Sequence, residues 1–442
     1  MMFPNILFLT IDNVRADKFN DNKSCLIPYL QNLIRNGVYF DHAISGADGT
    51  TISLANIFTG CYSLRTGIST YFFNNNTETF FDVLKQNNYH TYCCIPDLQF
   101  LIKTTMNFDG KIIYPYVNRD LYVGLFGGIG NQIIEQLKSK EMKEPWLFFI
   151  HLMDAKPPIT IPEEFNNMNY GNMKSDKILS AIDFWIGKIL HEVNLENTLI
   201  IISSDHGNFI PITDESLDKI PKNIHKLIRK CKNIKFLEKL GFHVFLFLRY
   251  MLKKIRKNKL KNLSSYESRS FSTRTKTELF DELIRVPLIF SGYNVTQHKK
   301  ISHLVRHVDI FPTIMTLLNI SLNKNIDGRS LYPLIQGKNL KEIPAYIENA
   351  SLKTMNLGER IGIRTSEYKY QRNRFDPTKN ISLYDLKNDP LEEKNIANNH
   401  KNIVESMEQI LLTIINDKSI QNEKTNLKQL LSKKRSKLTL KG

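Results

Sequence analysis

Four polar side chains of this sequence have the chemistry of a reaction centre: Asp12, Thr50, Asp205 and His206. Two carboxylates and an imidazole form a ligand set that suits Mn²⁺, Mg²⁺ or Zn²⁺ and also accommodates Ca²⁺. A hydroxyl such as that of Thr50 becomes an effective nucleophile when a nearby metal ion lowers its pKa. Together the four residues predict a metal-dependent ester hydrolase or group-transfer enzyme.

The elements that must position these residues are short apolar runs. The sequence predicts buried strands at residues 5–11, 146–151 and 198–203. It predicts helices after Pro28 and over residues 174–194. This alternation predicts an α/β fold with a sheet covered by helices on both faces. Ligands gather at the carboxyl ends of strands in such sheets. We therefore expect the polar groups at these ends to form one site: Asp12, His151 with Asp154, and Asp205 with His206.

Thr50 lies shortly before another predicted helix. We expect Ser53 to cap that helix, which runs through residues 55–58 and ends at Gly60. The positive end of a helix favours an anionic substrate group such as phosphate or sulfate. Further donors would stabilise the transferring group, and the candidates are Lys156, His151 and Lys276.

The charge of the chain is concentrated in one segment. Residues 219–276 hold 18 Lys or Arg and two acids, which accounts for the whole net charge of +16. A general affinity for nucleic acid is therefore not indicated, because the charge argument applies only locally. The five cysteines are scattered and predict neither a zinc site nor a disulfide framework.

The basic segment reads as an insertion over residues 214–276. Apolar residues on one helical face precede an almost wholly apolar stretch at 240–252. Such a pattern predicts peripheral membrane contact through 219–261. A helical lid with a solvated basic side is the alternative, and nucleic-acid binding ranks third because few aromatic residues alternate with the charges.

We find neither a signal peptide nor a transmembrane segment in the sequence. The expected location is therefore cytoplasmic, either free or peripherally associated with a membrane.

An ordered set of motifs resembles the sulfatase family of the alkaline-phosphatase-like superfamily. The set begins with the strand leading to Asp12, the helix over 28–37, the Thr50–Gly67 loop and helix, and Ser203–Gly207. It continues through later landmarks at 282–288, 307–313, 327–331, 367–370 and 383–390. The resemblance covers residues 4–397, apart from the basic insertion.

The resemblance implies a large mixed central sheet flanked by helices, with a smaller C-terminal α+β subdomain. The implied catalytic domain spans 1–213 and 277–335. The insertion at 214–276, a C-terminal subdomain at 336–416 and a basic tail at 417–442 complete the expected organisation.

The resemblance also implies residue roles. Thr50 would be the nucleophile, and the metal ligands would be Asp12, Thr50, Asp205 and His206. Asn13 replaces a second Asp found in many sulfatases, and Lys156 stands where a His often occurs. The implied substrate-binding residues are His151, Lys156, Lys276 and Asn13.

One departure from the family pattern changes the expected chemistry. Ordinary sulfatases oxidise a Cys or Ser within a C/S-x-P-x-R sequence to formylglycine, whereas this chain has Thr50, Ile52 and Leu54 at the motif positions. Thr cannot form that aldehyde, which favours a phospho-threonine intermediate, as in related phosphodiesterases and phosphoethanolamine transferases. The expected substrates are phosphate esters, or less favourably sulfate esters, linked to lipid or glycan. The alternatives are a sulfatase that works without formylglycine and a non-catalytic, membrane-associated scaffold.

Overall fold

The computed structural model describes residues 3–20, 24–73, 77–115, 124–209, 263–269, 278–295, 298–350 and 359–416. The chain divides into two compact units, and the larger comprises Met1–Asn208, Thr277–Pro390 and Asn395–Gly442. The smaller comprises Phe209–Lys276 and Leu391–Lys394. The basic segment 219–261 and Lys276 lie outside the described residues, so the predictions made for them remain predictions. No helix in the described part of the chain is both long and apolar enough to cross a bilayer.

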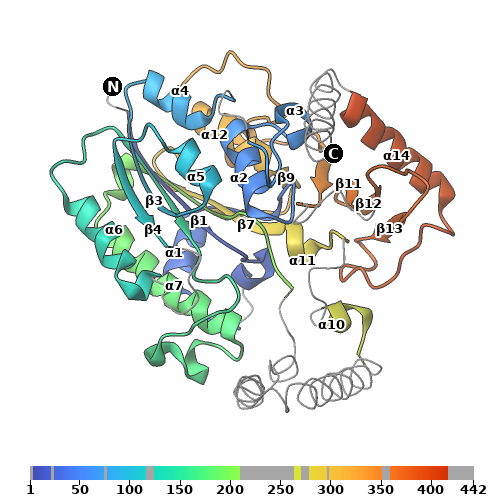
Figure 1. Cartoon of the computed structure of the whole chain (residues 1–442), viewed down its shortest axis with the longest axis horizontal. Coiled ribbons are helices and arrows are strands. Elements are labelled where there is room, and N and C mark those ends of the chain that lie inside the picture. Colours follow the sequence, from blue (N-terminus) through green and yellow to red (C-terminus); the bar gives the residue numbers. More distant parts are fainter. Residues whose placement is uncertain are drawn as a thin grey trace, which may run out of the picture. The chain divides into compact units, whose positions relative to one another are not determined.

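The larger unit is built on a mixed β-sheet (Figure 1). Within the described residues nine strands form it, in the order β4-β3-β5-β1-β6-β7-β2-β8, with β9 also paired to β2. The five strands from β4 to β6 are mutually parallel, whereas β7 runs antiparallel to both β6 and β2. This sheet confirms the predicted fold class. The strands are β1 (Asn5–Ile11), β2 (Gly37–Ile44), β3 (His90–Pro96), β4 (Gly110–Tyr114), β5 (Trp146–Leu152), β6 (Thr198–Ser204), β7 (Arg285–Gly292), β8 (Lys299–Ile301) and β9 (Val305–Arg306).

Helices cover both faces of the sheet. Successive side chains of a strand point to opposite faces, so each buried strand contributes apolar side chains to both helix layers. Ile6 and Phe8 of β1 pack into a core with the first group of helices, and Leu7 and Leu9 pack into a core with the second. The first group is α2 (Thr50–Thr59), α4 (Phe80–Gln86), α5 (Gln99–Thr104), α12 (Ile310–Leu317) and α13 (Tyr332–Ile335). The second is α1 (Pro28–Arg35), α6 (Ile129–Lys138) and α7 (Lys174–His191).

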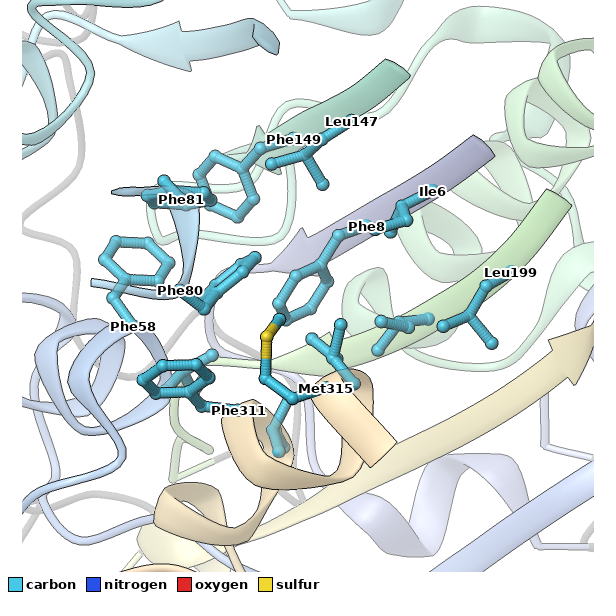
Figure 2. Close-up of a cluster of buried hydrophobic side chains, with 14 of the residues drawn as sticks. Ile6, Phe8, Phe58, Phe80, Phe81, Leu147, Phe149, Leu199, Phe311 and Met315 are labelled. Atoms are coloured by element: carbon cyan, nitrogen blue, oxygen red, sulfur yellow. The ribbon is translucent and has the colours of Figure 1, made fainter. Parts of the chain in front are cut away.

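Aromatic side chains fill the core beneath α2. Figure 2 shows Phe8 and Phe149 of the sheet directed toward Phe58, Phe80 and Phe81. The ring centroids of Phe58 and Phe149 are 5.2 Å apart with nearly perpendicular planes, a favourable edge-to-face arrangement. This packing fixes the helix that begins at Thr50 against the strands that end at the site.

The C-terminal part of the larger unit is the predicted α+β subdomain. Its four antiparallel strands are β10 (Ala345–Glu348), β11 (Arg360–Arg364), β12 (Tyr368–Asn373) and β13 (Ser382–Asp385). Apolar residues on one face of this sheet pack against α14 (Lys401–Asn416). Arg364 and Lys369 of the sheet form ion pairs with Asp281, which joins the subdomain to the main sheet.

The remaining described helices are short. They are α3 (Ser63–Thr66), α10 (Ser265–Arg269) and α11 (Asp281–Ile284), with 3-10 turns at Ala16–Phe19, Leu125–Gly127, Glu163–Phe165, Met168–Tyr170, Leu195–Asn197 and His307–Asp309. Of these, α11 and the turn at His307–Asp309 border the candidate site.

Candidate active site

The carboxyl ends of β1, β5 and β6 bring the predicted polar residues together. In the parallel register Ile11 of β1 pairs with Leu152 of β5 and with Ser204 of β6. Asp12 and Asp205 therefore leave neighbouring strands at the same level, and His151 lies one residue before the end of β5. Asp12, His151 and Asp205 are fully buried.

His206 approaches both carboxylates through Nε2. This atom lies 3.7 Å from Oδ1 of Asp12 and 3.6 Å from Oδ2 of Asp205. On the other side of the ring, Nδ1 lies 2.8 Å from the carbonyl oxygen of Gly207. A carbonyl oxygen only accepts, so Nδ1 carries the proton and Nε2 presents a lone pair toward the carboxylates. This orientation is typical of a histidine that ligates a metal.

The backbone around the two aspartates is tightly held. The Asn13 and His206 backbone N–H groups donate to Oδ1 of Asp205 at 3.3 and 2.7 Å. Asn13 has a φ of 65°, a left-handed conformation that Asn tolerates better than most residues. At Gly207 a Cβ would lie 2.1 Å from the carbonyl oxygen of Glu282, so only glycine fits after His206.

Three buried acceptor atoms at this point have no hydrogen-bond partner among the described residues. They are Oδ1 of Asp12, Nε2 of His151 and Oδ2 of Asp205. Ligand atoms of the same three residues lie within 4.8 Å of one another. Unpaired buried polar groups are costly, and a divalent cation would satisfy oxygen and nitrogen acceptors together. The residues therefore fit the metal that the sequence predicts.

Thr50 stands beside this cluster at the start of α2. It is the first residue of the helix, is partly buried, and its hydroxyl donates to Nε2 of His206 at 3.4 Å. The prediction that Ser53 caps this helix is wrong, because the N-cap is Gly49. Ser53 lies inside the first turn, and its hydroxyl instead donates to the carbonyl oxygen of Ala47 at 2.9 Å. Gly60 ends the helix in a left-handed conformation, as predicted.

The loop before Thr50 is anchored to the C-terminal sheet, a contact that sequence reasoning missed. Ala47 forms a parallel bridge with Glu348 at the end of β10. The Asp48 carboxylate accepts from the backbone N–H of Ala350 at 2.6 Å and from the Asn349 side chain at 3.3 Å. The C-terminal subdomain therefore helps to position the residue predicted to be the nucleophile.

Lys156 joins the site through an ion pair. Its ammonium nitrogen lies 2.9 Å from Oδ2 of Asp12, and its side chain is 22% exposed. Asp154 does not join the cluster, and its carboxylate accepts from the Leu125 backbone N–H. Lys276 lies outside the described residues. The structure thus groups Lys156, His151 and Asn13 around the aspartates and gives no position for Lys276.

Electrostatics and burial set the protonation of the site. Burial raises the pKa of Asp205, but the neighbouring basic side chains of His206, His151 and Lys156 outweigh this effect and hold the pKa below its ordinary range. Burial also lowers the pKa of His151, which favours a neutral imidazole. The same effect lowers the pKa of the buried His307, which interacts electrostatically with Asp205, to about 3. Ionised carboxylates and neutral imidazoles are the forms that bind a cation.

Comparisons with known proteins identify the family of this chain. The model of the sulfatase family matches residues 4–320, and that of the N-sulphoglucosamine sulphohydrolase C-terminal region matches residues 269–418. Arylsulfatase K of Gallus gallus is 29% identical over 172 residues, or 36% of this chain. The match covers 32% of the length of that relative.

Solved structures share the fold over nearly the whole chain. The phosphonate monoester hydrolase of Agrobacterium radiobacter superposes with a TM-score of 0.68 at 15% identity, covering 93% of this chain and 95% of that one. A 2-O glycosaminoglycan sulfatase superposes with a TM-score of 0.65 at 16% identity, covering 96% and 94%. At these identities the likeness shows the fold alone.

Proposed function

Because the chain belongs to the sulfatase family, we propose that it is a metal-dependent hydrolase or phosphotransferase of phosphate esters in which Thr50 is the nucleophile. The observation that carries this proposal is the convergence of three buried acceptors that have no hydrogen-bond partner among the described residues, close to His206, which the Thr50 hydroxyl contacts. A purely structural cluster would pair such atoms with donors. The ligands of the proposed metal are Asp12, Thr50, Asp205 and His206.

Each residue has a separate task in the proposed reaction. A divalent cation held here would lower the pKa of the Thr50 hydroxyl and offset the negative charge of the two aspartates. The α2 N-terminus favours an anionic ester group in front of Thr50. Lys156, with Asn13 nearby, would stabilise charge on the transferring group, and Lys276 is proposed for the same role from the sequence alone.

The proposed reaction has two covalent steps. The Thr50 hydroxyl releases its proton to solvent, and Oγ1 forms a bond to phosphorus while the bond from phosphorus to the ester oxygen breaks. The leaving alkoxide takes a proton from solvent and departs as an alcohol. Water, or an acceptor alcohol, then attacks phosphorus and loses its proton, the bond to Oγ1 breaks, and Thr50 regains a proton.

Phosphate is favoured over sulfate because Thr50 cannot become formylglycine. The likeness to a phosphonate monoester hydrolase is compatible with this choice. A sulfatase that works without formylglycine is the second candidate, motivated by the relative named arylsulfatase K. Substrates linked to a glycan or lipid are part of the proposal, as is peripheral membrane contact through 219–261.

One assay series separates these candidates. The chain is tested on aryl phosphate monoesters, phosphate diesters and sulfate esters with Mn²⁺, Mg²⁺, Zn²⁺ or Ca²⁺, and after chelation. We expect phosphate ester cleavage that needs a metal and is lost in Thr50→Ala. Preferential sulfate cleavage would support the second candidate, and failure on every ester would favour a scaffold.

Liposome co-sedimentation tests the membrane contact separately. We expect the intact chain to pellet with anionic vesicles more than a chain lacking 219–261, and equal pelleting would contradict the contact.

A further inference from the structure

His151 occupies a position that substrate binding does not explain. Its side chain is fully buried near the end of β5, with a ring nitrogen within 4.8 Å of carboxylate oxygens of Asp12 and Asp205. A residue that contacts a diffusing substrate needs an exposed atom, and among the described site residues Thr50 and Lys156 are the more exposed ones. The assignment of His151 to substrate binding, made from the sequence, therefore fits its surroundings poorly.

The hydrogen bonds of His151 indicate which ring nitrogen is free. Nδ1 lies 2.8 Å from Oγ1 of Thr10. The Thr10 hydroxyl is also placed to donate to the carbonyl oxygen of Ile150 at 3.3 Å, which leaves its oxygen to accept from Nδ1–H. In this tautomer Nε2 has no proton and offers a lone pair.

A lone pair on Nε2 faces two carboxylates that also offer only lone pairs. If Nε2 carried a proton, it would donate to Oδ1 of Asp12 or Oδ2 of Asp205, yet all three atoms lack partners among the described residues. These three acceptors have no hydrogen-bond partner among the described residues, and they belong to side chains whose ligand atoms lie within 4.8 Å of one another, so a cation would offset the cost of burying them. This arrangement matches the geometry of His206, whose Nδ1 is likewise fixed by a hydrogen bond while Nε2 faces the carboxylates.

We propose that Nε2 of His151 is a ligand of the cation, so that two imidazoles and two carboxylates bind it and the centre selects Zn²⁺ over Mg²⁺ and Ca²⁺. Imidazole nitrogen suits zinc and its first-row neighbours, whereas magnesium and calcium prefer oxygen ligands. Thr10 is then a positioning residue, because it holds the ring of His151 in the ligating orientation. This inference deepens the proposed function and rests on the metal site assigned there.

The test measures metal binding by the full-length chain, independently of ester cleavage. Metal-free protein is titrated with Zn²⁺ and with Mg²⁺ by calorimetry, using wild type, His151→Ala, Thr10→Val and the control His90→Ala, which lies at the start of β3. Loss of a residue that orients a ligand lowers metal affinity by roughly 10–100-fold. We expect that loss for Zn²⁺ in Thr10→Val and a larger loss in His151→Ala, with Mg²⁺ binding less affected and His90→Ala unchanged.

A second readout needs no variant and so does not depend on whether His151→Ala folds. In wild type loaded with Cu²⁺, pulsed electron paramagnetic resonance counts the coordinated imidazoles, and we expect two. One imidazole in this spectrum, or wild-type Zn²⁺ affinity in a folded His151→Ala, would overturn the inference. Two imidazoles in a chain that cleaves no ester would instead contradict the proposed function and leave this inference standing.

Discussion

The ammonium nitrogen of Lys156 lies 2.9 Å from Oδ2 of Asp12, while Oδ1 of the same carboxylate faces the metal cluster. One carboxylate therefore faces a fixed cation on one side and the proposed metal ion on the other. The two positive charges compete for Asp12, and the ammonium group remains close to the ester that Thr50 would attack.

Replacing Lys156 with Met should separate these two effects. A hydrogen bond to a charged group contributes about 1.5–3 kcal/mol, so we expect kcat/KM to fall by roughly 10–100-fold. Metal affinity should rise, because a like charge has been removed next to Asp12. Steady-state kinetics and metal titration measure the two quantities, and Lys138→Met, which removes a surface ion pair with Glu192, is the control. Weaker metal binding in Lys156→Met would contradict this account.

The anchor between Asp48 and β10 predicts an effect on rate without an effect on metal binding. In Asp48→Ala the loop before Thr50 loses its bonds to Ala350 and Asn349. Small misplacements of a reacting group cost up to about 100-fold in rate. We expect kcat to fall by about 10-fold or more while the dissociation constant of the metal stays within about 2-fold.

A matched variant controls for the loss of a carboxylate that caps a loop. Asp376→Ala removes such a group from an exposed turn, where it accepts from Thr378. It should leave kcat unchanged. Equal rates in Asp48→Ala and Asp376→Ala would show that the anchor does not position Thr50.

Much of this site could be predicted from the sequence because it lies at strand ends. Because β1 and β6 are adjacent parallel strands, the residues that directly follow them lie at the same edge of the sheet. The strand pattern alone therefore predicts that Asp12, Asp205 and His206 lie close together. The anchor of Asp48 could not be predicted in this way. It joins residues about 300 positions apart, and an Asp before a helix usually serves as a local cap.

The prediction for Ser53 failed for a different physical reason. Ser53 has the residue type of an N-cap, but its hydroxyl pairs with Ala47 because the helix begins one turn earlier at Thr50. The burial of His151 beside Thr10 could not be predicted either, because it depends on the register of β5 with β1. Residue type is visible in the sequence, whereas burial and orientation depend on tertiary packing.

Buried His307 should make stability depend on pH. Burial lowers its pKa to about 3, against an ordinary value of 6.5, so between these values only the unfolded chain binds the proton. The stabilising contribution of the neutral His307 is therefore fully present above pH 6.5. Below that pH this group lowers the free energy of unfolding by up to about 1.4 kcal/mol for each pH unit.

The prediction is tested by comparing wild type with His307→Gln, which cannot titrate. Between pH 7 and pH 5 the free energy of unfolding should fall by about 2 kcal/mol more in wild type. Denaturant titrations in the presence of a chelator measure this difference without interference from metal binding. Parallel losses in the two proteins would show that His307 does not carry the dependence.

The nucleophilic role of Thr50 is the central claim, and trapping its intermediate tests it most directly. The metal-loaded chain is mixed with an aryl phosphate, quenched with acid within the first turnovers, digested and analysed by mass spectrometry. We predict one phosphoryl group on the peptide that contains Thr50, located on Thr50 by fragmentation and absent from Thr50→Ala. Phosphate release that proceeds in Thr50→Ala at the wild-type rate, with Thr50 unmodified in wild type, would contradict the account.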